Sequence, residues 1–289
     1  MLIAELPPVA RAEAIRQFGR AAVDTALRSG ELVRIRHGVV AGAHLDRGRL
    51  FDVRVELARI REVAAASHGT AAELLGLARI GKTSDVIRIT RASGQGWREP
   101  GVVVGQATLP ASHLVHVAGV RCTGPARTAF DLARAGSFAG GVVAADSALR
   151  IGATKQQFAD VVADCRSFPH LRRAATALDF ADERAESALE SISRVAMHEC
   201  GLPAPVLQAW IYDGNVSIGR VDFLWPEAKV IGEADGLSKY TLPAVLQMEK
   251  LRQEQLERAG YRVVRWTWRD VWLNREEWHR RLAWALGVA

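Results

Sequence analysis

The segment from Val221 to Gly236 constrains the fold of this chain more than any other, because it places acidic residues on two strand-like runs around a turn. Val221–Trp225 and Ala228–Glu233 both have strand composition, and Pro226-Glu227 between them is typical of a turn. The segment therefore predicts a β-hairpin. Besides Glu227 in the turn, its acidic residues are Asp222, Glu233 and, two residues further on, Asp235.

The parity of this hairpin decides which side of the sheet the acids face. A two-residue connection places Asp222 opposite Ile231; a four-residue loop keeps the same parity, and an odd loop destroys it. Directly opposed residues share a face, as does every second residue along a strand. Asp222, Glu233 and Asp235 are therefore expected on one side of the sheet.

Carboxylates gathered on one face suit a hard divalent cation. Mg²⁺, or Mn²⁺ in its place, takes oxygen ligands, keeps several waters and accepts substrate phosphate as a further ligand. Asp222 and Glu233 are the predicted metal ligands, and an ion between them would activate water and stabilise the leaving oxygen of a phosphodiester. The alternative is that Asp222, Glu227 and Glu233 are solvated charges on an exposed sheet face, the commoner fate of acids in strands.

The helices predicted on either side of the hairpin carry further candidates. Glu190, on the preceding helix, is either another acid of the site or part of a capping box with Ser187, and both interpretations stay open. Lys250 and Gln253 are three residues apart on the helix predicted from Thr241 to Ala259. There they either face the same cleft, where an ammonium stabilises phosphorane charge, or remain surface residues.

The first 48 residues have the pattern of a winged helix-turn-helix. Helical periodicity from Val9 to Phe18 and from Arg20 to Ser29 is interrupted at Gly19, and the alternating run Leu32–Arg36 then leads into a turn at His37-Gly38. In such a module the second helix enters the major groove and the wing contacts the DNA backbone. A small helical cap with solvated arginines is the alternative. The predicted DNA contacts are Arg20, Arg28, Arg34, Arg36 and His37.

Composition agrees with an anionic partner but does not identify it. A chain of 289 residues with 49% hydrophobic residues can form two or three domains, and its net charge of +6 is carried by arginine-rich surfaces that suit phosphate. Three cysteines without metal-ligand spacing indicate a reducing cytoplasm and no zinc. The sequence shows no signal peptide or membrane-spanning run, so we expect a cytoplasmic protein that binds double-stranded DNA and no membrane.

The middle of the chain has mixed patterns without recognisable chemistry. Helical periodicity extends from Phe51 to Ala66, and a strand is predicted from Leu114 to Val120. The predicted fold class is therefore α+β or mixed, and its oligomeric state stays open. The predicted ranges are a winged helix-turn-helix at 1–48, a mixed α/β middle region at 49–181, and a region of helix, antiparallel strands, helix and strand at 182–289.

Several blocks of residues resemble known families. Those of the C-terminal region resemble the very-short-patch-repair (Vsr) endonucleases, within the PD-(D/E)XK nuclease superfamily. The N-terminal segment and Thr123–Ala133 resemble the AbiEi-like antitoxins of type IV toxin–antitoxin systems. The nuclease-like blocks are Ser187–Ser191 with Arg194, Gly201–Pro205 with Gln208, Arg220–Glu227, Glu233–Gly236, Gly260–Arg265 and Thr267-Trp268.

The nuclease resemblance implies roles for individual residues. Asp222 and Glu233 would bind Mg²⁺, Glu190 would be the helix acid, and Gln208 would lie near the site. Asp235, which stands where the superfamily pattern has a lysine, completes the predicted catalytic set together with Lys250 and Gln253. The missing lysine could be replaced from another element by Lys239 or Lys250.

Two functions follow from these resemblances. The first is a Mg²⁺-dependent DNA endonuclease that hydrolyses phosphodiesters and is guided by its winged-helix region. The second is a non-catalytic AbiEi-type antitoxin and autorepressor, bound at the promoter of a toxin operon, whose nuclease fold is degenerate.

Overall fold

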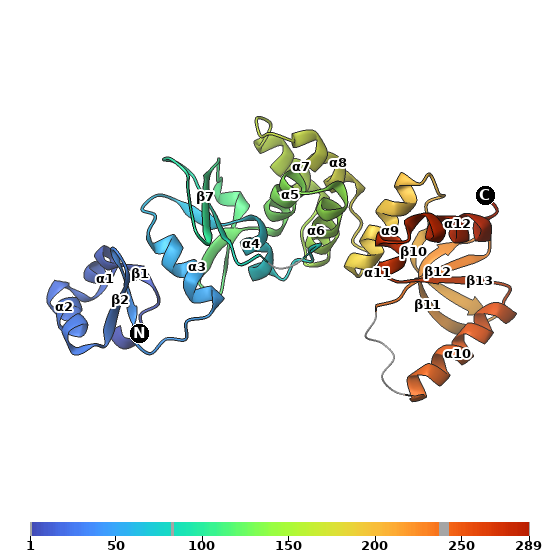
Figure 1. The fold of residues 1–289 in the computed structure, drawn as a ribbon, viewed down its shortest axis with the longest axis horizontal. Coiled ribbons are helices and arrows are strands. Elements are labelled where there is room, and N and C mark those ends of the chain that lie inside the picture. The colour runs from blue at the N-terminus through green and yellow to red at the C-terminus, as the bar shows by residue number, and fades with distance from the viewer. Residues whose placement is uncertain (1, 82–83, 237–242, 289) are drawn as a thin grey trace. The chain divides into compact units, whose positions relative to one another are not determined.

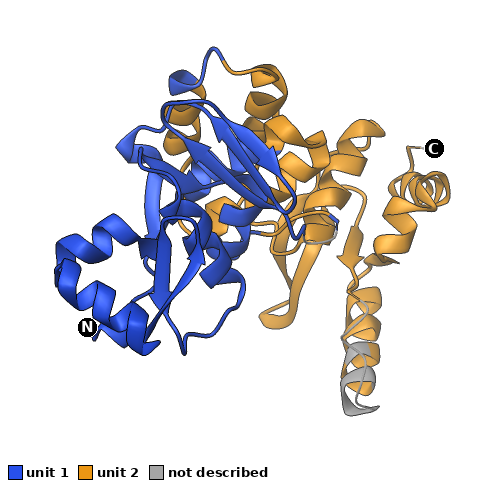
Figure 2. Ribbon diagram, turned by 60° about the vertical axis from the view of Figure 1, so that its left-hand side comes forward, with its two compact units in different colours: residues 1–77, 81–132, 163–167 blue, residues 78–80, 133–162, 168–289 orange. Residues whose placement is uncertain are grey.

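The computed structural model describes residues 2–81, 84–236 and 243–288 and has a mixed α/β architecture with three sheets (Figure 1). The chain packs into two compact units (Figure 2). The first contains residues 1–77, 81–132 and 163–167, and the second contains 78–80, 133–162 and 168–289. The boundaries of these units differ from the three ranges predicted from the sequence, and those ranges stay predictions.

The helix pair and hairpin predicted for the N-terminal region are present in the predicted order. The two helices are separated at Gly19, whose φ of 84° is a conformation that residues with a side chain rarely adopt. The hairpin strands pair antiparallel, and a short strand before the first helix adds to them. The elements are η1 (Ile3–Glu5), β1 (Val9–Ala10), α1 (Arg11–Phe18), α2 (Arg20–Ser29), β2 (Leu32–Arg36) and β3 (Val39–Gly42).

Two small apolar clusters hold these elements. Val23 and Leu32 are buried between the helices and the hairpin. On the other side of the hairpin, Val39 and Ala41 pack against Phe51 of α3 (Arg49–Ala58). The hairpin therefore has apolar contacts on both sides, which fixes it to α3 within the first unit.

A six-stranded sheet of order β6-β7-β5-β4-β9-β8 forms the rest of the first unit's core. The helix predicted from Phe51 to Ala66 is wrong at its end, because residues 64–66 form a central strand. The strand predicted from Leu114 to Val120 is two strands, joined by a turn at Ala118-Gly119 with both φ values positive. The elements are β4 (Ala64–Ala66), α4 (His68–Leu75), β5 (Ile87–Arg91), β6 (Trp97–Glu99), β7 (Val102–Gln106), η2 (Ala111–His113), β8 (Leu114–Val117) and β9 (Val120–Thr123).

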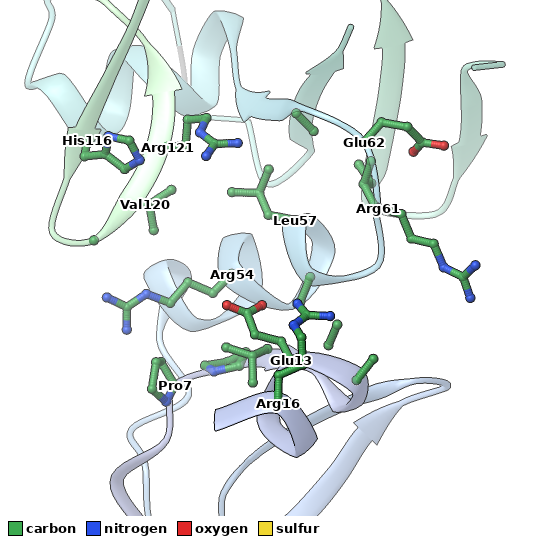
Figure 3. Close-up of a pocket in the computed structure, with 18 residues that line it drawn as sticks. Pro7, Glu13, Arg16, Arg54, Leu57, Arg61, Glu62, His116, Val120 and Arg121 are labelled. Carbon is green, nitrogen blue, oxygen red and sulfur yellow. The ribbon is translucent and has the colours of Figure 1, made fainter. Parts of the chain in front are cut away.

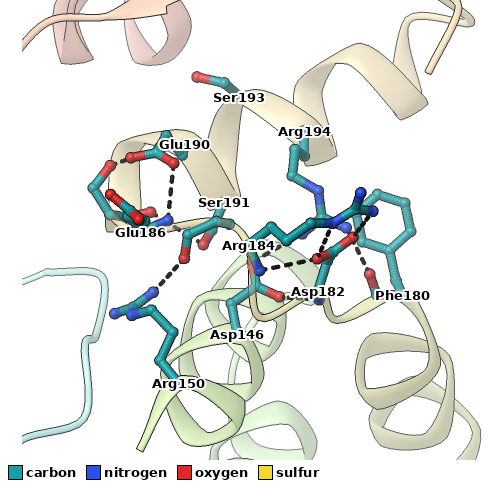
Figure 4. Close-up of polar contacts among 12 residues, drawn as sticks. Asp146, Arg150, Phe180, Asp182, Arg184, Glu186, Glu190, Ser191, Ser193 and Arg194 are labelled. Atoms are coloured by element: carbon teal, nitrogen blue, oxygen red, sulfur yellow. Dashed lines mark hydrogen bonds and ion pairs between the residues drawn. The ribbon is translucent and has the colours of Figure 1, made fainter. Parts of the chain in front are cut away.

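Helices follow the sheet in sequence, and a buried ion pair ties three of them together (Figure 4). Asp146 of α6 lies 2.9 Å from Nη1 of Arg194 in α9 and accepts a 2.7 Å hydrogen bond from the backbone of Asp182. Arg194 also donates to the carbonyl of Phe180 at 2.8 Å. The helices are α5 (Pro125–Ala135), α6 (Phe138–Arg150), α7 (Lys155–Asp164), α8 (Leu171–Phe180) and α9 (Ala188–Glu199).

The C-terminal sheet has the order β10-β11-β12-β13, antiparallel except for the parallel pair β12 and β13. An aromatic cluster packs in its core, where the Trp266 ring lies 5.3 Å from Phe223 and 5.7 Å from Trp278. A second cluster joins Ile231 to Leu256 of α10. The elements are β10 (Val206–Asp213), β11 (Val216–Trp225), β12 (Val230–Ala234), α10 (Pro243–Arg258), β13 (Arg262–Trp266), α11 (Trp268–Trp272) and α12 (Arg275–Leu286).

The order predicted for this region, a helix, antiparallel strands, a helix and a strand, is therefore present. No helix in the described part of the chain combines the length and apolar character needed to cross a bilayer.

Candidate functional site

The predicted hairpin is formed by β11 and β12, and its two acids oppose each other. Leu224 pairs with Ile231, and a four-residue connection, 226–229, joins the strands. Continuing the register by two residues puts Asp222 opposite Glu233. The predicted parity is correct, but the pairing of Asp222 with Ile231 is wrong, because the connection is longer by two residues. Lys229 closes that loop with a left-handed φ of 50°.

Glu233 is a buried carboxylate on β12 that shares its site with Asp222 and with Arg252 of α10. Burial, followed by the negative charge of Asp222, raises the pKa of Glu233 to about 7. Arg252 opposes this rise, since its Nη2 lies 3.0 Å from Oε1 of Glu233. Asp222 accepts a 2.8 Å hydrogen bond from the backbone N–H of Ala234.

Glu190 adds a third carboxylate from the first turn of α9. The hydroxyl of Ser187 caps this helix and accepts from the N–H of Glu190 at 3.1 Å. The carboxylate of Glu190 accepts from the N–H of Glu186 and from Nε2 of Gln208, both at 2.8 Å. Burial raises the pKa of Glu190, and the charge of Asp222 adds to the rise. Ser187 therefore caps the helix, but the Glu190 carboxylate accepts from Glu186 and not from the N-cap residue, so the capping box is incomplete. The role of Glu190 as an acid of the site stays a prediction.

We call Glu190, Asp222, Glu233 and Arg252 the acid cluster. Gln208 touches it from β10 with a strained backbone, since its φ is 54° within a strand. Strain of this kind collects at functional sites, where surrounding contacts hold the conformation. The hydrogen bond to Glu190 is one such contact.

The remaining predicted catalytic residues take other positions. Asp235 lies 3.6 Å from Nη1 of Arg265, so an arginine partner faces it. Gln253 donates to Glu257 at 2.9 Å, one turn along the same helix. Lys250 is exposed on α10, and Lys239 lies outside the described residues.

The structure gives the predicted divalent metal site in the acid cluster no direct support. Among the residues that the structure describes, no group of three or more His, Cys, Asp and Glu side chains could hold an ion. Arg252 already supplies positive charge at Glu233, and Glu190 accepts two hydrogen bonds, both at Oε2. The predicted Mg²⁺ ligands Asp222 and Glu233 are thus brought together, but with a guanidinium beside them.

The predicted DNA contacts fall into two groups. Arg36 of the hairpin lies 3.2 Å from Glu56, a buried residue of α3, so it helps to hold the hairpin on that helix. Arg36 is itself 48% exposed, so only this ion pair sets it apart from the other predicted contacts, which are also exposed. Asp24, which shares a helix face with two of them, is neutralised by an ion pair with Arg11. The other predicted contacts are Arg20, Arg28, Arg34 and His37.

A buried charged cluster, which we call the Arg127 cluster, was missed by the sequence interpretation. The side chains of Arg127 and Asp131 are both 1% exposed and lie 3.0 Å apart on α5. Nη1 of Arg127 also donates to the carbonyl of Thr108 at 3.0 Å and lies 2.9 Å from Nδ1 of His113. Burial and then the charge of Arg127 lower the pKa of His113, which favours a neutral ring that accepts. The available signal was an Arg–Asp pair at i,i+4 inside an apolar run.

Comparisons with known proteins agree with part of the predicted resemblance. A family profile of the AbiEi antitoxin C-terminal domain matches residues 58–180, which include the Arg127 cluster, so the AbiEi resemblance is confirmed for Thr123–Ala133, while that of the N-terminal segment stays a prediction. The crystal structure of the RV2827C protein from Mycobacterium tuberculosis aligns with a TM-score of 0.42 and 16% identity, over 72% of this chain and 84% of that one.

Two relatives come from the same organism. They are the uncharacterized protein MT2308 of Mycobacterium tuberculosis strain CDC 1551 / Oshkosh and the uncharacterized protein Rv2248 of strain ATCC 25618 / H37Rv. Each is 32% identical over 247 residues, which cover 85% of this chain and 89% of the relative. The chain therefore belongs to the family of these two mycobacterial proteins, and its residues 58–180 match the AbiEi antitoxin C-terminal domain.

Proposed function

We propose that this protein is a DNA-binding regulator of the antitoxin type that acts at the promoter of its own operon. The observation that carries the proposal is the AbiEi antitoxin domain at residues 58–180. The helix pair and hairpin that precede this domain have the order of a winged helix-turn-helix. Assignment of residues 1–48 to that class, and double-stranded DNA as the partner, belong to the proposal.

The charge distribution on α2 supports contact with a phosphate backbone. Arg20, Asp24 and Arg28 recur at intervals of four and so share one face of the helix. Because Arg11 neutralises Asp24, the face presents the two arginines without an opposing acid. Arg34 adds an exposed guanidinium from the hairpin. Exposed arginines on a second helix and a hairpin suit backbone contacts that position a protein on DNA.

Binding to a duplex from upstream of the gene, followed by fluorescence anisotropy, tests this function. Wild-type protein should bind that duplex more tightly than a scrambled one, and the double variant Arg20→Gln/Arg28→Gln should lose roughly ten-fold or more in affinity. The slope of log affinity against log salt should fall by about two, since two phosphate contacts are removed.

The matched control is Arg88→Gln/Arg98→Gln, which removes two exposed arginines of the six-stranded sheet. This control should bind like the wild type. Equal affinity of wild type and Arg20→Gln/Arg28→Gln, or absence of binding at low salt, would reject the proposal.

Hydrolysis of DNA is a second candidate, in which residues 182–289 are a Vsr-like nuclease domain of the PD-(D/E)XK superfamily that uses Mg²⁺ or Mn²⁺. Its specific support is the approach of Glu190, Asp222 and Glu233 from three elements, with the pKa of both glutamates raised. The guanidinium of Arg252 opposes it. We therefore place it behind the regulatory function.

Plasmid nicking in Mg²⁺ or Mn²⁺ separates the two candidates. A nuclease should nick supercoiled plasmid, and Asp222→Asn should abolish nicking while leaving DNA affinity unchanged. The regulator alone should nick nothing under either metal. Nicking that persists in Asp222→Asn would exclude the acid cluster as its source.

A further inference from the structure

A groove lined with arginines lies within the first compact unit, between the N-terminal helix and the sheet domain (Figure 3). One wall comes from residues 7–16, which include β1 and part of α1. The opposite wall comes from the end of α3, the segment that follows it, and the turn between β8 and β9. The volume is about 770 Å³. Pockets for small molecules have volumes of roughly 300–1,000 Å³, so the groove is of that size.

Basic side chains dominate the charge of this groove. Two acids also line it, but Glu62 is paired with Arg91, which lies 2.5 Å away. Glu13 of α1 is therefore the acid that faces the groove without such a partner among the described residues. The basic residues of the lining are Arg16, Arg54, Arg61, Arg121 and His116.

Three of the arginines are available to a ligand. Arg54 is half-buried and donates to the carbonyl of Ala118. Arg16, Arg61 and Arg121 are exposed, and within the described ranges they make no side-chain hydrogen bond or ion pair with the rest of the chain. An anion could thus bind their guanidinium groups without breaking an existing ion pair.

The groove also has an apolar surface beside its charges. Pro7 lies on one wall, and Leu57 and Val120 lie on the other (Figure 3). A flat ring could pack against these side chains. The guanidinium groups of Arg16 and Arg121, which stand on opposite walls, could then donate hydrogen bonds to phosphate oxygens.

We infer that this groove binds a nucleotide, with its phosphates at Arg16 and Arg121 and its base against the apolar wall. The inference rests on the groove alone and is independent of DNA binding by α2 and the hairpin. Since the two walls belong to the N-terminal module and to the sheet domain, a bound nucleotide should fasten them to each other and raise the thermal stability of the first unit.

Isothermal titration calorimetry of the full chain with ribonucleoside mono-, di- and triphosphates tests the inference. At least one nucleotide should bind with a dissociation constant below about 1 mM. Arg16→Gln/Arg121→Gln should weaken that binding ten-fold or more. Glu13→Gln should tighten it, because it removes the opposing charge. Unfolding temperature, followed by circular dichroism, should rise with the same nucleotide in the wild type and rise much less in Arg16→Gln/Arg121→Gln.

The control Arg88→Gln/Arg98→Gln removes the same charge from the sheet outside the groove and should bind the nucleotide like the wild type. Three results would overturn the inference. One is no binding by any nucleotide up to about 1 mM. Another is equal loss in the control, which would indicate net charge alone. The third is binding of inorganic triphosphate and of a scrambled duplex with the same dependence on Arg16 and Arg121, which would make the groove a backbone contact for DNA.

Discussion

The Arg127 cluster and the acid cluster bury the same types of side chain, but only the first is internally balanced. Nε of Arg127 meets Asp131 on the same helix, and Nη1 meets the carbonyl of Thr108 and the ring of His113. In the acid cluster, Glu190, Asp222 and Glu233 approach from three elements, and burial together with the charge of Asp222 raises the pKa of both glutamates. A buried charge that is paired with an opposite charge stabilises one fold. A group of buried like charges instead marks a site where protonation or binding partners can change.

The largest expected effect tests the balanced cluster. Arg127→Met should cost roughly 3–5 kcal/mol of unfolding free energy, because Asp131 remains buried without its partner. Arg127→Met/Asp131→Leu should recover part of this loss, since both charges are removed together. Urea unfolding followed by circular dichroism measures both. A loss below about 1 kcal/mol in the single variant would mean that the cluster is not a structural anchor.

The acid cluster should respond to pH in the opposite sense to an ordinary paired carboxylate. Because the folded-state pKa of Glu233, about 7, exceeds its ordinary value of 4.5, the folded state binds the proton more tightly, and stability falls as pH rises from 4.5 through 7. Glu233→Gln should remove this dependence and stabilise the protein at pH 8 by up to about 3 kcal/mol. At pH 4.5 it should have little effect.

Urea unfolding at several pH values measures the Glu233→Gln effect, and Glu227→Gln is its control. Glu227 is exposed in the turn of the same hairpin, so this variant should follow the wild type at every pH. If the unfolding free energy of the wild type does not change between pH 5 and pH 8, the acid cluster would not differ from the Arg127 cluster in its response to protonation.

Gly232 tests whether the strand of the acid cluster is held from its other face. A Cβ at this position would lie 2.4 Å from Cη2 of Trp266, which is fully buried. Gly232→Ala should therefore cost roughly 1–3 kcal/mol through overpacking. Gly236→Ala meets open space and should change stability by less than about 0.5 kcal/mol. Similar losses of unfolding free energy in the two variants would show that the side chains of the aromatic cluster can move to accommodate the added methyl group.

The smallest expected effect separates the cap of α9 from the acid cluster. Ser187→Ala should cost about 1 kcal/mol by removing the N-cap, and Ser137→Ala should cost about the same at the N-cap of α6. Urea unfolding of both variants provides the comparison. A clearly larger loss for Ser187→Ala would show that this serine also holds Glu190 within the acid cluster.

Local patterns predicted the elements whose preferences agree with their surroundings. The helix pair, the hairpins and the parity of β11 and β12 follow from periodicity, turn residues and glycine, so they could be read without knowledge of distant contacts. Residues 64–66 could not, because alanine favours a helix and only pairing with β5 and β9 makes this segment a strand. The length of the β11–β12 connection was likewise not determined, since loops of two and of four residues place Asp222 and Glu233 on the same face.

The sequence by itself determined that Asp222 and Glu233 share a hairpin and that Arg127 and Asp131, four residues apart on a predicted helix, share one of its faces. Tertiary structure alone decided which charges meet. It placed Arg252 of α10 against Glu233 of β12, and Arg36 of β2 against Glu56 of α3. The two residues of each pair belong to different elements, so their contact depends on how those elements pack. Short-range spacing fixes which face a residue takes, but the energy of a buried charge depends on the partners that the fold brings to it.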